Sequence, residues 1–268
     1  MTIRAKFRKK LVGLLVGSLK KEGLPQIFIN PYDMLGRQVL EDGLHEYGYL
    51  QALLAWATEQ VPELKKDGFI DVGANIGNHS LFFQHHFACG YAFEPMPLAY
   101  KVAEANFLLN NVKNTHLFNV GLDCEPRKLP FWQQDGNLGG SGFLAPQSPH
   151  AENETYSQIE CTTVVADDFP PLIKRDRRIG LVKIDVEGFE NNVLLGMRGL
   201  LDSDAPLVVF ESHGDAGMSQ IGLLQDFGYT EFFIVEKTVV LGVFNKYRVK
   251  KSNVLKRDQM YPMVIAKK

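Results

Sequence analysis

Hydrophobic residues between positions 69 and 210 form short runs that are separated by longer amphipathic segments. Five runs are predicted as strands: residues 69–72, 91–94, 117–120, 179–184 and 206–210. Three segments with apolar residues at helical spacing are predicted as helices: residues 78–86, 98–110 and 190–201. Strands that alternate with such helices indicate βαβ units and a parallel sheet, whose ligand-binding strand ends lie along one edge.

The regular alternation is interrupted between the third and fourth strands. Residues 128–132 and 159–165 are predicted as strands of a β insertion, and they flank a segment rich in Gly, Ser, Asn and Pro at 135–155. A loop of this length inside a compact domain is usually functional or disordered. We therefore expect the loop to form part of the substrate-side surface.

The two ends of the chain complete the predicted fold. Residues 33–61 are predicted to be helical, and residues 230–235 and 261–265 are predicted to close the sheet as a pair of strands. The pattern predicts an α/β, Rossmann-like fold, in which a mostly parallel seven-stranded sheet has helices on both faces. We divide the chain into an N-terminal helical extension, 1–62, and a ligand-binding domain, 63–268.

Charge is distributed unevenly along the chain. Seven of the 29 Lys and Arg residues lie in the first 21 positions, which contain none of the 31 Asp and Glu residues. Nucleic-acid binding usually requires a broad basic surface, so the acidic remainder of the chain argues against it. Leu11, Leu14, Leu15 and Leu19 form one apolar helix face, but the run is shorter than the roughly 18 residues of a membrane span. This helix is expected to pack on the domain or to lie on an anionic membrane surface.

A glycine-containing turn follows the first predicted strand and carries the main chemical signal. Asp71, Gly73, Asn75 and Gly77 lie in the segment DVGANIG, directly before a predicted helix. Gly73 allows close approach of a ligand to the backbone, and the free N–H groups of the helix face that ligand. Glu94 ends the second predicted strand, where a carboxylate can accept hydrogen bonds from ribose hydroxyls. The arrangement predicts a cofactor that contains ribose.

The type of cofactor follows from what the turn lacks. A dinucleotide site typically has the pattern G-x-G-x-x-G, in which the backbone reaches the pyrophosphate. Here Asn75 stands at the middle glycine position and Gly77 is displaced by one residue. A cofactor with ribose and adenine but without phosphate therefore fits the turn better.

Three segments resemble the signature of FkbM-type methyltransferases: DVGANIGNHS at 71–80, FEP at 93–95 and VKIDVEGFE at 182–190. The resemblance extends over residues 43–265. It implies a class I methyltransferase fold, S-adenosylmethionine as the methyl donor, and O-methylation of a hydroxyl on a carbohydrate or secondary metabolite.

The resemblance also implies which residues lie at the cofactor. They are Asp71, Gly73, Asn75 and Gly77 around the methionine part, Glu94 at the ribose, Asn119 and Val120 near the adenine, and Asp185 facing the methyl-transfer centre.

A hydroxyl group is a poor nucleophile while it is protonated, so methyl transfer to it requires a general base or a metal ion that promotes loss of its proton. Asp185 and Glu211 end adjacent predicted strands, and His213 follows the fifth strand by three residues. We take these three residues as catalytic candidates, with His213 as the base because its ordinary pKa lies near neutrality. The same residues suit Mg²⁺ or Mn²⁺, but the sequence contains no tight ligand motif and we assign no metal site.

Two other functions stay open from the sequence. One is an NAD(P)-dependent oxidoreductase, which the missing dinucleotide pattern disfavours. The other is a non-catalytic, membrane-associated protein that binds S-adenosyl ligands, which the basic N-terminal helix suggests. The segment DVEG at 185–188 disfavours N-methylation of a planar amine.

We expect a cytoplasmic protein whose acceptor is a small molecule or glycan. If the basic N-terminal helix binds a membrane, the protein is expected to be peripheral at that membrane. The sequence specifies neither the acceptor nor the oligomeric state.

Overall fold

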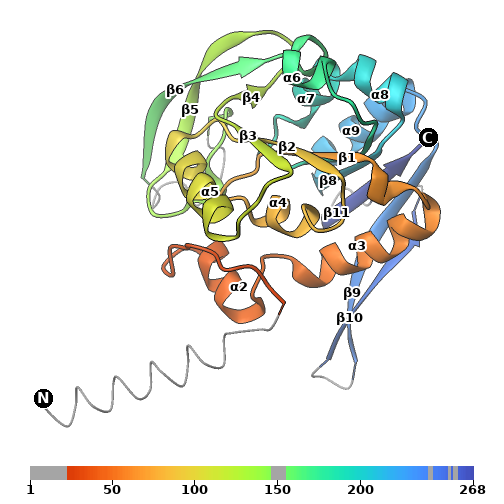
Figure 1. The fold of residues 1–268 in the computed structure, drawn as a ribbon, viewed down its shortest axis with the longest axis horizontal. Coiled ribbons are helices and arrows are strands. Elements are labelled where there is room, and N and C mark those ends of the chain that lie inside the picture. Colours follow the sequence, from red (N-terminus) through yellow and green to blue (C-terminus); the bar gives the residue numbers. More distant parts are fainter. Residues whose placement is uncertain (1–22, 146–154, 241–243, 253–254, 256–258) are drawn as a thin grey trace, which may run out of the picture.

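The computed structural model describes residues 23–145, 155–240, 244–252, 255 and 259–268 (Figure 1). The strands of the main sheet are β1 (Gly68–Val72), β2 (Cys89–Phe93), β3 (Thr115–Phe118), β7 (Ile179–Ile184), β8 (Leu207–His213), β9 (Glu231–Val240), β10 (Phe244–Lys251) and β11 (Met260–Lys267). A second sheet contains β4 (Gly121–Leu122), β5 (Arg127–Gln134) and β6 (Tyr156–Val164).

The helices connect these strands. The α-helices are α2 (Met34–Asp42), α3 (Tyr47–Gln60), α4 (Asn78–Phe83), α5 (Pro97–Leu109), α6 (Pro170–Ile173), α7 (Glu190–Gly196), α8 (Arg198–Asp204) and α9 (Gly214–Asp226). Short 3₁₀ segments are η1 (Leu64–Lys66), η2 (Leu138–Gly140) and η4 (Ala166–Asp168). The apolar helix predicted at residues 11–19 lies outside the described residues.

The strand order of the main sheet is β10-β9-β11-β8-β7-β1-β2-β3. The five strands from β8 to β3 pair in parallel, whereas β11, β9 and β10 pair antiparallel. The α/β, Rossmann-like class with a mostly parallel sheet is therefore confirmed. The predicted closing pair is also confirmed, because β9 and β11 lie side by side.

Helices cover both faces of the sheet because alternate strand residues point to opposite sides (Figure 1). Val182 and Phe210 pack in one hydrophobic cluster with α7, α8 and α9. Leu181 and Val209, one residue away on each strand, pack in a second cluster with α3 and α4. Strands that are buried on both faces are hydrophobic at consecutive positions, which is why the apolar runs predicted them well.

The prediction of seven strands was wrong by one, because β10 adds an eighth strand at the edge. Its sequence is dominated by basic residues, and the sequence analysis did not identify a strand there. Tyr247 and Val249 are half-buried and pack with the cluster that contains α3. The ring centroid of Tyr247 lies 4.9 Å from that of Tyr49 on α3. This contact between distant segments holds β10 in place and has no local sequence signal.

The predicted helical segment 33–61 forms two helices. Gly43 ends α2 with a φ of 84°, a left-handed conformation that glycine adopts readily. Leu50, Leu53 and Ala57 of α3 are fully buried in the cluster that also contains strand residues of β1, β7 and β8. The division of the chain at residue 62 stays a prediction, and α3 shares a hydrophobic core with the sheet.

The predicted β insertion forms its own small sheet. β5 and β6 pair antiparallel along their full length, and β4 pairs in parallel with β6. After β5 the chain turns back, so that Trp132 pairs with Gly142. Residues 146–154 of the predicted loop lie outside the described residues.

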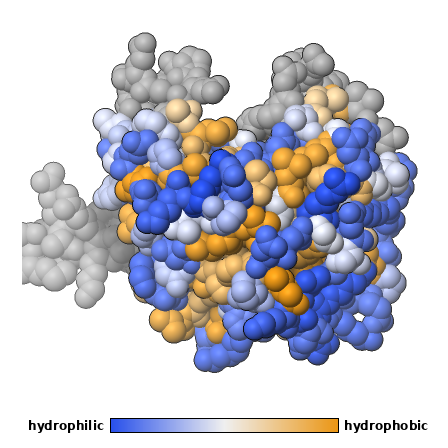
Figure 2. All heavy atoms as spheres, turned by 90° about the horizontal axis from the view of Figure 1, so that it is seen from above, coloured by the Kyte–Doolittle hydropathy of each residue, from blue (hydrophilic) through white to orange (hydrophobic). Residues whose placement is uncertain are grey.

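Hydrophobic and hydrophilic residues are mixed on the face of the molecule that Figure 2 shows. The most exposed large apolar side chains in the described residues are Tyr32 and Leu108, at 87% and 78%. They belong to separate segments, the approach to α2 and the end of α5, and single exposed apolar residues are normal. Among the described residues, no helix combines the length and the apolar character needed to cross a membrane.

Candidate active site

A cavity of about 910 Å³ opens at the carboxyl ends of β1, β2, β7 and β8. Gly73, Glu94 and Asp185 line it directly after β1, β2 and β7, and Glu211 lines it two residues before the end of β8. The loop between α2 and α3 and the β insertion form the opposite walls. Ligands of parallel α/β sheets bind at this edge, so the cavity lies where the sequence predicted the site.

The turn after β1 has the backbone conformation that its glycines permit. Gly73 and Gly77 have φ values of 75° and 83°. A Cβ atom on Gly73 would lie 1.9 Å from the carbonyl oxygen of Asp185, and one on Gly77 would lie 2.8 Å from the ring of Phe107. Gly73 is thus required for contact with the end of β7 and for the left-handed turn, in addition to the ligand approach that the sequence predicted.

Glu94 follows β2 and is 5% exposed. Its two carboxylate oxygens accept hydrogen bonds from the backbone N–H groups of Asn75 and Met96, each at 2.8 Å. Burial raises the pKa of Glu94 to about 7, and the two backbone hydrogen bonds limit the rise. Each oxygen has a second lone pair, so the carboxylate can accept further hydrogen bonds from a ligand in the cavity.

Lys183 forms a buried ion cluster below the glycine turn. Its ammonium group lies 3.4 Å from Asp71 and 3.2 Å from Asp185, and it donates to the carbonyl oxygen of Gly73 at 3.4 Å. Asp71 also accepts a hydrogen bond from Ser80 at 2.6 Å. Burial lowers the pKa of Lys183, but the charges of Asp185 and Asp71 outweigh it and the pKa lies above its ordinary value. Lys183 therefore joins two predicted site residues, although the sequence analysis gave it no role.

Asn119 and Val120 lie just beyond β3, where the sequence placed them. The side-chain amide of Asn119 donates to the carbonyl oxygens of Glu94 and Pro95, at 2.9 and 3.1 Å. Val120 is half-buried against the main hydrophobic cluster. The adenine contacts of both residues stay predictions, and Asn119 also supports the backbone that carries Glu94.

The Asn119→Ala variant separates these two roles. If Asn119 mainly supports the backbone, the free energy of unfolding falls by about 1 kcal/mol, since one part-buried and one exposed hydrogen bond are lost. The affinity for S-adenosylhomocysteine is then expected to change less than about threefold, which corresponds to under 1 kcal/mol. Thermal unfolding and calorimetric titration measure the two effects. A large loss of affinity with unchanged stability would instead assign Asn119 to the adenine.

The remaining predicted catalytic residues belong to β8. Glu211 lines the cavity and is half-buried. His213 is the last residue of β8, which extends three residues further than predicted, and its backbone pairs with Met260. The side chain of His213 lies outside the described part of the structure, so its role as the base stays a prediction.

Glu187 and Glu190 lie in the turn after β7 and at the start of α7. Glu190 is 6% exposed and accepts hydrogen bonds from the N–H of Gly188 and from Gln220. These contacts fit a structural role at the helix start. Glu187 instead lines the cavity and is exposed to it.

Three cavity residues near the α2–α3 loop were not among the predicted site residues. The side-chain amide of Asn78 makes two hydrogen bonds with the backbone of His45. It accepts one from the N–H group at 3.0 Å and donates one to the carbonyl oxygen at 3.1 Å. The Nε2 atom of His79 lies 3.3 Å from the carboxylate of Glu46. Burial lowers the pKa of His45, which favours the neutral imidazole. The sequence signal was the pair of polar residues that interrupts the helical pattern at 45–46, which ends 25 residues before Asp71.

Strained backbone conformations gather at this cavity. Five described residues other than glycine have positive φ values, and Glu46, Asn75 and Glu187 are three of them, at 58°, 50° and 51°. All three line the cavity. Such conformations cost about 1–3 kcal/mol each and cluster at functional sites, so their position supports a functional role for the cavity.

The part of the chain that the structure describes contains no group of three or more His, Cys, Asp or Glu residues placed to hold a metal ion. Because the side chain of His213 is not described, this finding does not bear on the set formed by Asp185, Glu211 and His213.

Comparison with known proteins identifies relatives of this chain. It is 30% identical to the 31-O-demethyl-FK506 methyltransferase FkbM of Streptomyces tacrolimicus over 196 residues, which cover 61% of this chain and 73% of that protein. It is 29% identical to Methyltransferase 1 of Beauveria bassiana (strain ARSEF 2860) over 146 residues, or 49% of this chain. That match spans only 59% of the fungal protein.

A solved structure of the methyltransferase FkbM from Methylobacillus flagellatus KT aligns with 75% of this chain and 44% of its own, at 12% identity and a TM-score of 0.44. The family model described as the methyltransferase FkbM domain matches residues 71–237, which include the glycine turn, Glu94 and Asp185. Since this match covers more than half of the chain, the protein belongs to the FkbM methyltransferase domain family.

Proposed function

We propose that this protein is an S-adenosylmethionine-dependent methyltransferase that methylates a hydroxyl group on a carbohydrate or secondary metabolite. The observation that carries the proposal is one cavity that unites the glycine turn, the buried carboxylate of Glu94 and the ion-paired Asp185. These are the residues that the family resemblance places at the methionine part, the ribose and the methyl-transfer centre.

The residues present fit this cofactor. Glu94 is fixed by two backbone N–H groups and retains lone pairs for ribose hydroxyls. The side-chain oxygen of Asn75 is buried in the cavity wall without a hydrogen-bond partner among the described residues. A buried acceptor without a partner costs free energy, so it favours a ligand donor such as an ammonium group. When bound, the cofactor supplies a methyl group on a positively charged sulfur.

The outer part of the cavity has features that suit an acceptor with a ring and polar groups. Tyr49 and Tyr247 pack edge to face there, and Lys237, Asn245 and Met263 line the same region. Aromatic faces bind the apolar side of a ring, while amide and ammonium groups bind its polar substituents. The protein's main contribution to transfer is to hold the acceptor oxygen in line with the methyl group. The name of the Streptomyces relative, which specifies an O-methyl position, also supports a hydroxyl acceptor.

Calorimetric titration with S-adenosylmethionine, S-adenosylhomocysteine and NAD(H) tests the cofactor. We expect the two S-adenosyl ligands to bind with micromolar affinity and NAD(H) not to bind. Transfer of a radiolabelled methyl group to a panel of glycosides and hydroxylated metabolites then tests the acceptor class. Binding of NAD(H) alone would favour the oxidoreductase, and binding of S-adenosyl ligands without transfer to any hydroxyl would reject O-methylation of these acceptors.

A further inference from the structure

Glu187 occupies an unusual position at the end of β7. It follows the ion-paired Asp185 by two residues and has a left-handed backbone with a φ of 51°. A Cβ atom on Gly142 of the β insertion would lie 3.1 Å from the Cβ atom of Glu187, so the insertion packs against it. The residue is therefore held between β7 and the insertion, with its carboxylate at the cavity.

The carboxylates around Glu187 differ from it in their partners. Asp185 lies 3.2 Å from Lys183, and Glu190 accepts hydrogen bonds from Gly188 and Gln220. Glu211, from the neighbouring strand β8, lines the same cavity. Glu187 makes no hydrogen bond or ion pair with any described residue. It is a carboxylate without a partner beside other carboxylates, and such a site favours a cation.

Its protonation follows from these surroundings. Glu187 is open to the cavity, but the protein around it removes part of its hydration, and this raises its pKa to about 8. The charges of Asp185, Glu211 and Glu190 add to the rise, and Lys183 opposes it. Burial alone would raise the pKa of Asp185, but the charges of Lys183, His79 and His45 lower it below its ordinary value. At neutral pH the empty site therefore keeps Glu187 mostly protonated, while Asp185 is ionised.

We propose that Glu187 is the counter-charge of the cofactor's sulfonium group: it is ionised while S-adenosylmethionine is bound and protonated when S-adenosylhomocysteine is bound. This inference rests on the proposed function and adds to it a residue that distinguishes the substrate from the product. The two ligands differ by one methyl group and one positive charge, so a carboxylate near the sulfur recognises the difference by charge.

Total charge is conserved in the reaction, because the positive charge lost by the sulfur is matched by the proton that Glu187 takes up. The acceptor oxygen forms a bond to the methyl carbon while the carbon–sulfur bond breaks, and the sulfur keeps the electron pair as a neutral thioether. The hydroxyl proton has to leave the acceptor at the same time. Loss of the sulfonium charge restores the affinity of Glu187 for a proton, so its carboxylate takes up that proton directly or through water. The neutral product is then held less tightly than the charged substrate.

Proton release on binding tests the inference without an acceptor. Both ligands are titrated calorimetrically at pH 7 in buffers that differ in ionisation enthalpy, which gives the number of protons released per ligand. Protons from the shared amino group and from Glu94 cancel in the difference between the ligands. With Glu187 near pKa 8, S-adenosylmethionine is expected to release up to about 0.9 proton more than S-adenosylhomocysteine.

In the Glu187→Gln variant, the two ligands are expected to release equal numbers of protons. Its preference for S-adenosylmethionine over S-adenosylhomocysteine is expected to fall about tenfold, which is the free-energy equivalent of one pKa unit. Glu187→Gly, which suits the left-handed backbone, serves as a second variant if the first folds poorly. Glu104→Gln, on the exposed surface of α5, is the matched control and keeps the wild-type difference. A wild-type protein without the difference, or a Glu187 variant that retains it, would overturn the inference. If neither ligand binds the wild-type protein, the proposed function itself fails.

Discussion

The Glu94→Ala variant is expected to bind S-adenosylhomocysteine at least about a hundredfold more weakly than the wild-type protein. Hydrogen bonds to a charged acceptor contribute about 1.5–3 kcal/mol each, and the variant loses two to the ribose. It also frees the backbone N–H groups of Asn75 and Met96, which Glu94 anchors at 2.8 Å. Calorimetric titration measures the affinity, and thermal unfolding of the same sample shows whether the turn remains folded.

The pH dependence of binding provides a second test of Glu94. Burial raises the pKa of Glu94 from 4.5 to about 7. Without a bound ligand, its carboxyl group is therefore mostly protonated below about pH 7 and mostly ionised above it. The ribose hydroxyls require the ionised form. The affinity for S-adenosylhomocysteine is therefore expected to fall as the pH is lowered from about 8 to about 6. This neutral ligand is chosen because Glu187 does not ionise to bind it. An affinity that is independent of pH, or unchanged in Glu94→Ala, would contradict the ribose assignment.

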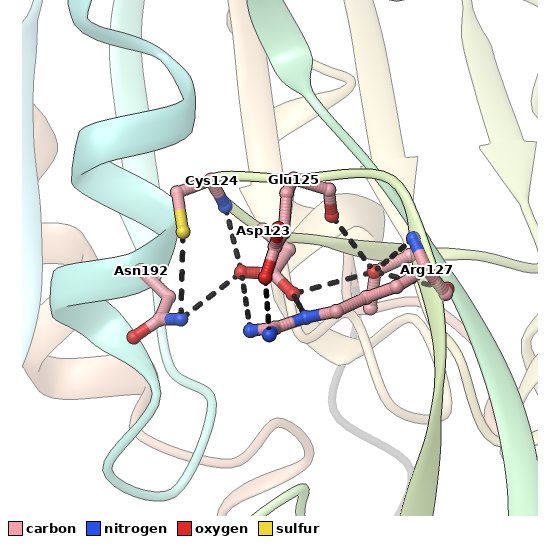
Figure 3. A network of polar contacts seen from close by, with 6 residues as sticks. Asp123, Cys124, Glu125, Arg127 and Asn192 are labelled. Carbon is pink, nitrogen blue, oxygen red and sulfur yellow. Dashed lines mark hydrogen bonds and ion pairs between the residues drawn. The ribbon is translucent and has the colours of Figure 1, made fainter.

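The largest expected effect on stability is at Asp123, which joins the β insertion to the main domain. Figure 3 shows its carboxylate between Arg127 at the start of β5 and Asn192 on α7. It accepts from Arg127 Nε at 2.7 Å, Asn192 at 3.0 Å, the N–H of Cys124 at 2.7 Å and Thr163 of β6 at 3.3 Å. Asp123 is fully buried, so these contacts replace its hydration completely.

Replacing Asp123 with Ala is expected to lower the free energy of unfolding by about 3 kcal/mol. This value is at the lower end for a broken buried pair because Arg127 is 35% exposed and water can solvate it in the variant. Chemical denaturation measures the change. Lys128→Ala is the matched control on the same strand: its pair with Glu160 is 67% and 63% exposed, and its loss is expected to cost less than about 1 kcal/mol.

The pH profile separates the charge of Asp123 from its packing. Burial raises the pKa of Asp123, but the hydrogen bonds from Arg127 and Asn192 outweigh it and the pKa lies below 3.8. The ionised carboxylate therefore stabilises the fold above that pH, and its contribution is lost as the pH falls through the lowered pKa. The stability difference between the wild type and Asp123→Ala is expected to be constant near neutrality and to narrow only below about pH 3.8. Equal costs for Asp123→Ala and Lys128→Ala would contradict the role of the buried network.

The sequence predicted the parts of the fold that depend on local pattern. Strands such as β1 and β7 are buried on both faces, and their continuous apolar runs are visible without the structure. Glu94 and Asp185 could be placed because parallel strands bring their carboxyl ends to one edge. The same rule found Glu211, which lines the cavity.

The parts that were missed depend on contacts between distant segments. His45 reaches the site because Asn78, 33 residues away, holds its backbone. The family resemblance implied that Asn119 lies near the adenine, and this stays a prediction; its hydrogen bonds to the backbone next to Glu94 depend on how two strand ends lie together, which the sequence does not show. Lys183 lies in the segment VKIDVEGFE, but the sequence does not show that it lies between Asp71 and Asp185. That position depends on how β1 pairs with β7, where Asp71 and Lys183 are opposite each other.

The outer row of β10 has a consequence for the behaviour of the molecule in solution. Lys246, Arg248 and Lys250 are exposed along this edge strand, which pairs only with β9 among the described strands. An open strand edge can recruit the edge of another chain and extend into an aggregate, but two such edges would bring rows of positive charge together. Lys250 also lies 3.3 Å from Glu236 of β9, which offsets part of this charge. We therefore expect the basic residues of β10, which hid this strand in the sequence, to disfavour self-association through the sheet edge.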